Sequence, residues 1–222
     1  MKALILAAGK GTRLRSLNPN LPKPLVRIKG KPLILWNIEK LRDSGINKIV
    51  INLFHQGAQI REFLGNGSEY GVDIQYSEEE DLLGTGGGAG NALSLLGKGV
   101  FLLISADVWT DLDFSSMALE KSRLAHLILK NNPINHPKGD VSLQNGLVSD
   151  SLETLRLTFS GIALMNPSIF KNIHEQKYGL WDSVLKPACS QELVTGELYE
   201  GVIFNVNTPE DVEKLDALLN EE

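Results

Sequence analysis

Cysteine is almost absent from this chain, because Cys189 is the only one among 222 residues. A single thiol cannot form an intramolecular disulfide or a thiolate metal cluster, which favours a reducing compartment such as the cytoplasm. With no partner thiol, we expect Cys189 to be a small buried apolar residue. Disulfide-stapled scaffolds and zinc–cysteine sites are therefore excluded.

Long hydrophobic runs are also lacking. The first apolar run ends at Gly9 and is shorter than the core of a signal peptide. No later stretch approaches the roughly 20 apolar residues that a membrane helix needs. We therefore expect a cytoplasmic protein with no membrane partner.

An excess of positive charge is missing as well. The chain has 22 Lys and Arg against 27 Asp and Glu, a formal charge of −5, whereas nucleic-acid binding proteins normally show a basic face. The 42% hydrophobic and 22% charged residues are typical of a soluble globular domain. We expect one domain over residues 1–222, a monomer or weak homo-oligomer, with no nucleic-acid partner but with small anionic substrates still possible.

Two familiar phosphate-binding motifs are absent from the opening stretch "ALILAAGKGTRLR", residues 3–15. A Walker A loop requires a glycine where Leu4 stands and a hydroxyl residue where Gly11 follows Lys10. The dinucleotide fingerprint requires a third glycine at position 14, which is leucine. The loop after this strand must therefore serve another purpose.

What the sequence does contain is an alternation of short apolar runs and helical stretches, such as "ALILA", "PLILWNIEKLRDSG", "KIVINL" and "VFLLIS". This alternation predicts an α/β fold over residues 1–130, doubly wound around a mainly parallel, Rossmann-like sheet. Pro32 and Gly45 bracket one expected helix, and Thr208 with Pro209 opens the last one. Residues 131–150 are rich in Asn, Pro and Gly and predict a small inserted hairpin or loop over the sheet.

Ligands of parallel sheets bind beyond the carboxyl ends of the strands, and four groups of residues lie there. In the opening loop, Gly9 and Gly11 allow close backbone approach, while Lys10, Arg13 and Arg15 supply cations for phosphate oxygens. In "PKP", two prolines restrict the backbone around Lys23. The alternative for the opening loop is a solvated surface turn, and the alternative for "PKP" is an exposed lysine in a proline turn.

The third and fourth groups follow later strands. The segment "LLGTGGGAGNAL", residues 82–93, carries so many glycines that something flat or crowded should touch its backbone, with a helix starting immediately afterwards. A surface loop is the alternative. Asp107 stands two residues past "FLLIS" and predicts a Mg²⁺ ligand, although a carboxylate there could also cap a helix.

Together these blocks resemble the sugar-1-phosphate nucleotidylyltransferases. The resemblance rests on "AAGKGTRLR", "LPKPL", "LGTGGG" and the strand that ends in Asp107, in the family's order. The segments "DVWTD", "NPINHPKGD", "TFSGIALMNPSIF", "VTGELYEG" and "NTPEDV" are more narrowly similar to the short N-acetylmuramate-1-phosphate uridylyltransferases of bacterial cell-wall recycling. The resemblance covers nearly the whole chain and implies the fold of the nucleotide-diphospho-sugar transferases.

The resemblance implies that a sugar-1-phosphate attacks a nucleoside triphosphate, here UTP, and that pyrophosphate leaves. It implies a nucleotide-binding core in residues 1–130 and a sugar-binding half in residues 131–222. Arg13 and Lys23 are the implied catalytic residues, and Asp107 and Asn205 the implied Mg²⁺ ligands. The implied nucleotide-binding residues are Ala8, Gly9, Gly11, Thr12, Gly84, Thr85, Gly86 and Gly87. The implied sugar-binding residues are Asp140, Thr158, Ser160 and Gly161.

One position departs from the family pattern. Asn205 stands where related enzymes usually have a second metal-binding aspartate, and Asn207 replaces a glycine. Losing one negative charge should weaken Mg²⁺ binding by roughly a few kcal/mol at an effective dielectric constant near 20. Three hypotheses stay open: the uridylyltransferase; a mannose- or heptose-1-phosphate guanylyltransferase that uses GTP; and a nucleotide- or sugar-binding module that has lost catalysis.

Overall fold

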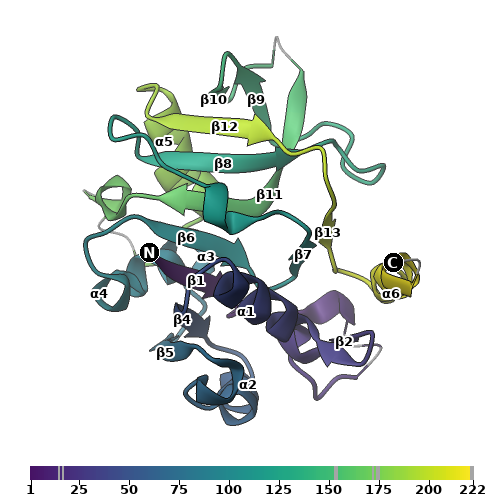
Figure 1. Ribbon diagram of the computed structural model, residues 1–222. Helices are drawn as coiled ribbons and strands as arrows, with labels where there is room; N and C mark the ends of the chain where they lie inside the picture. Colours follow the sequence, from purple (N-terminus) through teal and green to yellow (C-terminus); the bar gives the residue numbers. More distant parts are fainter. Residues whose placement is uncertain (15, 17, 153–154, 172, 174–175, 221–222) are drawn as a thin grey trace.

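The computed structural model describes residues 1–14, 16, 18–152, 155–171, 173 and 176–220 (Figure 1). Its main strands, in chain order, are β1 (Lys2–Leu6), β4 (Lys48–Leu53), β5 (Asp73–Glu78), β6 (Phe101–Ser105), β8 (Ala125–Lys130), β9 (Val141–Gln144), β10 (Leu147–Ser149), β11 (Arg156–Met165) and β12 (Val194–Leu198). Over the described residues they form one nine-stranded sheet in the order β5-β4-β1-β6-β11-β8-β12-β10-β9. Two short pairs lie outside it, β2 (Arg27–Ile28) with β3 (Lys31–Pro32) and β7 (Val108–Thr110) with β13 (Ile203–Asn205).

The sheet is mixed, not mainly parallel. Strands β5, β4, β1 and β6 are parallel, as the apolar runs predicted. Strand β11 is antiparallel to β6 on one side and to β8 on the other. The reversal arises because the chain leaves β8 through a hairpin and returns in the opposite direction as β11. The α/β class is thus confirmed, and the prediction of a mainly parallel sheet is corrected.

Helices cover both faces of this sheet. They are α1 (Leu33–Asp43), α2 (Gly57–Leu64), α3 (Gly84–Asn91), α4 (Leu93–Leu96) and α5 (Lys186–Cys189). Helix α6 (Pro209–Asn220) instead packs against β2 in a separate core cluster. Alternation along β1 shows the two faces: Ile5 belongs to the core cluster that includes α1 and α2, whereas Leu4 belongs to the cluster that includes α3, α4 and α5. Cys189 is buried in the second cluster, as expected.

Helix boundaries follow the predicted signals. Helix α1 starts directly after Pro32, and Gly45 follows it in a left-handed conformation with φ of 78°. At the start of α6, the Thr208 side chain accepts a hydrogen bond from the Asp211 backbone N–H at 3.3 Å, which is the expected cap. None of the helices among the described residues is long and apolar enough to cross a membrane.

The inserted hairpin consists of β9 and β10, joined at Asn145 and Gly146. Both turn residues have positive φ, 52° and 77°, as a two-residue type I′ turn requires. The hairpin pairs with β12 and β11 and therefore extends the sheet at its edge, whereas the sequence suggested that it lies over the sheet. It lies at the top of Figure 1, far from α2.

Strands from both halves of the chain alternate within the sheet. Strand β11, from the half after residue 130, lies between β6 and β8, which precede residue 130. The two halves thus share one sheet and its hydrogen bonds. The assignment of nucleotide binding to residues 1–130 and of sugar binding to residues 131–222 stays a prediction.

Candidate active site

The carboxyl ends of β1 and β6 open into a cavity of about 420 Å³. The two strands are parallel neighbours, so the loops that follow them meet at one edge of the sheet. Nine of the residues implied by the sequence line this cavity: Ala8, Gly9, Gly11, Thr12, Arg13, Lys23, Gly84, Thr85 and Asp107. Arg15, another expected cation, lies outside the described residues.

Lys23 and Asp107 form an ion pair within the cavity. Lys23 begins a short 3₁₀ turn after Pro22, and its Nζ lies 2.5 Å from Asp107 Oδ2, with the two side chains 15% and 24% exposed. Gly11 makes this approach possible, because it has φ of 55° and a Cβ there would lie 2.8 Å from Lys23 Cβ. The opening loop and the "PKP" turn are therefore one packed unit.

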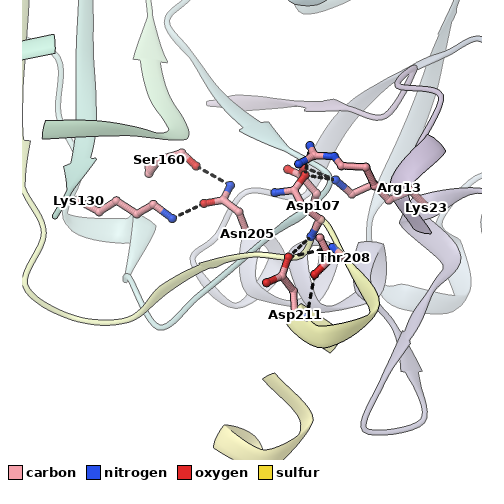
Figure 2. A network of polar contacts seen from close by, with 9 residues as sticks. Arg13, Lys23, Asp107, Lys130, Ser160, Asn205, Thr208 and Asp211 are labelled. Carbon is pink, nitrogen blue, oxygen red and sulfur yellow. Dashed lines mark hydrogen bonds and ion pairs between the residues drawn. The ribbon is translucent and has the colours of Figure 1, made fainter. Parts of the chain in front are cut away.

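Asn207 joins two cations of the site, Arg13 and Lys23, and was not predicted to act there. Its Oδ1 accepts hydrogen bonds from Arg13 Nη2 at 2.8 Å and from Lys23 Nζ at 2.9 Å. Its backbone N–H donates to Asp211 Oδ2 at 2.9 Å, inside the cap of α6. Figure 2 shows Arg13, Lys23 and Asp107 gathered beside this cap. The sequence feature that could have identified Asn207 is its amide side chain, which stands between a strand and a helix cap.

A second unpredicted residue, Asn52, ties the floor of the cavity together. It is 2% exposed, and its Oδ1 accepts from the Ala7 N–H at 2.7 Å while its Nδ2 donates to Glu79 Oε1 at 2.6 Å. Glu79 Oε2 then accepts from the Leu83 N–H at 3.0 Å, just before α3. Asn52 therefore holds the end of β1 and the start of α3 at fixed positions. The sequence feature that could have identified Asn52 is its position as a polar residue inside the apolar run "KIVINL".

The glycine-rich segment forms a helix, α3, and is not a loop that precedes one. The N–H groups of Gly86 and Gly87 donate to the Tyr178 carbonyl at 3.1 and 3.2 Å, so a protein oxygen occupies this helix start. A Cβ on Gly86 would lie 2.5 Å from the Tyr178 ring. Gly84 and Thr85 face the cavity, whereas Gly86 and Gly87 face residues 176–178. The close approach that the glycines predicted is thus made mainly by the chain itself.

A second cavity, of about 290 Å³, adjoins the first and shares with it Leu6, Thr85, Ser105 and Asp107. Ser160, Gly161 and Trp181 line its other side. The pairing of β11 with β8 shifts register between Phe159 and Ile162, and Gly161 at this bulge has φ of 89° and approaches Ser105 closely. The bulge therefore brings the β11 backbone to the cavity wall.

Asp140 and Thr158 anchor the 131–140 loop beside β11. Asp140 Oδ2 accepts from the Phe159 N–H at 2.9 Å, and its Oδ1 lies 2.9 Å from His136 Nε2. Thr158 Oγ1 donates to Asn132 Oδ1 at 2.8 Å. The structure thus brings Ser160 and Gly161 together with Asp107, while Asp140 and Thr158 take part in contacts within the protein.

The implied metal ligands do not form a donor pair. Asp107 and Asn205 both line the second cavity, but Asn205 Oδ1 accepts a hydrogen bond from Lys130 Nζ, and Asp107 pairs with Lys23. Burial lowers the pKa of Lys130, and the charges of Asp107, Asp211 and Asp140 oppose this effect. Among the residues described, no group of three or more His, Cys, Asp or Glu side chains could hold a metal ion. This set does not fit a divalent cation held jointly by residues 107 and 205.

Comparison with known proteins defines the class of this site. Residues 2–131 match the family model described as nucleotidyl transferase. Over 216 residues the chain is 41% identical to the N-acetylmuramate alpha-1-phosphate uridylyltransferase of Neisseria meningitidis serogroup B, covering 94% of each protein. It is 26% identical to the D-glycero-alpha-D-manno-heptose 1-phosphate guanylyltransferase of Campylobacter jejuni, over 95% of this chain and 96% of the relative.

The fold agrees with these similarities. The structure of HddC from Yersinia pseudotuberculosis in complex with GMP-PN superimposes with a TM-score of 0.80 at 22% identity, covering 98% of this chain and 99% of the other. The chain belongs to the nucleotidyl transferase family and is a sugar-1-phosphate nucleotidyltransferase with the nucleotide-diphospho-sugar transferase fold.

Proposed function

We propose that the enzyme transfers a uridylyl group from UTP to N-acetylmuramate 1-phosphate and releases pyrophosphate, as in the recycling of bacterial cell wall. The identity of 41% over 94% of both chains supports this pair of substrates over the heptose and GTP pair, for which the corresponding identity is 26%. The observation that carries the proposal is the pair of adjoining cavities, because they meet at Asp107, between a cationic loop and the β11 bulge.

In this proposal the first cavity binds the nucleotide. Arg13 and Lys23 contact the phosphates, with Lys10 beside them in the same cavity. The backbone of Ala8, Gly9, Gly11 and Thr12 borders the triphosphate, and Gly84 with Thr85 borders the ribose and base. Because Lys23 and Arg13 are already held by Asn207, their charges are positioned before substrate arrives, which lowers the reorganisation needed for catalysis.

The sugar phosphate enters the second cavity, beside Ser160 and Gly161. Its phosphate oxygen attacks the α-phosphorus in line, and pyrophosphate leaves toward the cations of the opening loop. Catalysis consists of positioning and charge neutralisation with no covalent enzyme intermediate. Magnesium accompanies the nucleotide phosphates in this proposal and supplies additional positive charge when bound.

Pyrophosphate release by the purified protein tests the proposal. We expect release that requires both UTP and N-acetylmuramate 1-phosphate and that is at least about a hundredfold slower with GTP and mannose 1-phosphate. An Asp107→Asn variant is the inactive control. Selective use of GTP with mannose or heptose 1-phosphate would contradict the proposal in favour of the guanylyltransferase. If the folded protein releases no pyrophosphate with any of these substrate pairs, a binding module without catalysis would be favoured.

A further inference from the structure

Lys130 makes a contact that the proposed reaction does not use. It is the last residue of β8, while Asn205 is the last residue of β13. The Lys130 Nζ donates to Asn205 Oδ1, and Asn205 Nδ2 donates to the Ser160 carbonyl at 3.3 Å (Figure 2). Both ends of the Asn205 amide are therefore bound within the protein.

These partners fix the orientation of the Asn205 amide. In the flipped orientation, the NH₂ group would face the Lys130 ammonium, donor against donor, and the carbonyl would face the Ser160 carbonyl, acceptor against acceptor. Neither pair can hydrogen-bond, so the observed orientation is the stable one. The Asn205 oxygen consequently points at an ammonium group.

The charges around the site also disfavour a cation beside the Asn205 oxygen. Asp107 is a carboxylate at the junction of the two cavities, and Lys23 and Lys130 bring one ammonium each, to Asp107 and to Asn205 respectively. The resemblance to related enzymes predicts a carboxylate at position 205. This chain has an amide there, and the Lys130 ammonium is hydrogen-bonded to it. A neighbouring ammonium repels a divalent cation.

We propose that Lys130 is a positioning residue that holds the Asn205 amide and supplies a built-in positive charge, so that position 205 is not a metal ligand in this enzyme. This inference rests on the proposed function. It concerns the charge at the junction of the two cavities, where that reaction would take place. Any divalent cation that arrives with the nucleotide then has no protein ligand at position 205.

The proposal changes what an aspartate at position 205 should do. With Lys130 present, an Asn205→Asp carboxylate would form an ion pair with the ammonium. Restoring a two-carboxylate metal site therefore requires the second change, Lys130→Met, which removes the ammonium but keeps an apolar stem. Lys98→Met is the matched control, because exposed Lys98 precedes β6 and thus lies at the opposite end of the strand from Asp107.

Mn²⁺ binding without nucleotide, measured by electron paramagnetic resonance, tests the inference. We expect the double variant Lys130→Met/Asn205→Asp to bind Mn²⁺ about tenfold or more tightly than Asn205→Asp alone. Asn205→Asp with Lys98→Met should match Asn205→Asp. Equal Mn²⁺ affinity of Asn205→Asp and the Lys130→Met double variant would overturn the proposal.

Nuclear magnetic resonance of the natural protein keeps the test decisive if the double variant does not fold. The Asn205 side-chain amide signal, identified by its loss in Asn205→Asp, should shift in Lys130→Met and stay unchanged during a Mg²⁺ titration. A Mg²⁺-dependent shift of that signal would contradict the proposal. These measurements use no substrate, so a failure of the proposed function would show only in the pyrophosphate assay.

Discussion

Lys23 lies at the centre of the polar contacts that the structure describes in the first cavity. It pairs with Asp107 and donates to Asn207, which also binds Arg13. The sequence predicted Lys23 and Asp107 because each follows a local pattern, a proline turn and a strand end. Asn207 and Lys130 escaped prediction because their partners lie 184 and 75 residues away, and only the tertiary fold shows such contacts.

Replacing Lys23 by methionine should slow pyrophosphate release by roughly 10²–10³-fold, because a pre-positioned charge at the reacting phosphates is lost. We expect kcat to fall more than nucleotide affinity, since Arg13 and the loop backbone remain. Steady-state kinetics with Lys98→Met as the matched loss of charge measures this. A Lys23→Met enzyme with native kcat would show that Lys23 has no part in the chemical step.

At the scale of one element, α3 is unusual because a helix so rich in glycine is intrinsically unstable, by roughly 1 kcal/mol for each glycine relative to alanine. The reason lies in its neighbour, since Tyr178 covers Gly86 and Gly90 and its carbonyl accepts from the helix start. Sequence reasoning expected crowding at these glycines but could not identify Tyr178 as its source, because that residue is nearly ninety positions away.

A double-mutant cycle tests this contact. A Cβ on Gly90 would collide with the Tyr178 hydroxyl oxygen, whereas the next nearest atom, Cζ of the same ring, lies at 3.5 Å. Gly90→Ala alone should therefore destabilise the protein by about 1–3 kcal/mol. In a Tyr178→Phe background the same change should stabilise by up to about 1 kcal/mol, since alanine favours the helix.

Urea unfolding of the four proteins in the cycle gives the free energies. The decisive result is the change of sign between the two backgrounds. If Gly90→Ala has the same effect with tyrosine and with phenylalanine, the hydroxyl does not explain the glycine.

On the scale of the whole molecule, the α/β class and the parallel half of the sheet were predictable from apolar periodicity. The position of β11 was not, because nothing local in "LRLTFSGIALM" specifies that it pairs with β6 and β8 in the antiparallel sense. Cytoplasmic location and a monomeric or weakly associated state stay predictions from the sequence.

The shared sheet predicts that residues 1–131, close to the span of the family match, do not fold alone. In that fragment β6 lacks β11, and β8 lacks both of its partners, β11 and β12, so apolar strand edges stay unpaired. We expect aggregation on size-exclusion chromatography and no cooperative thermal transition. Co-expression with residues 132–222 is the control that should recover soluble complex, and a monomeric fragment with a cooperative transition would contradict the prediction.

The same strand order has a consequence for the chain as it leaves the ribosome. Strand β8 is synthesised before either neighbour, since β11 ends at Met165 and β12 at Leu198. At translation speeds of about 5–20 residues per second, roughly 3–14 seconds pass between the synthesis of β8 and that of its second partner, β12. During that interval the apolar "AHLILK" strand of the nascent chain keeps an unpaired edge, so we expect this segment to be the part of the unfinished chain most prone to aggregation.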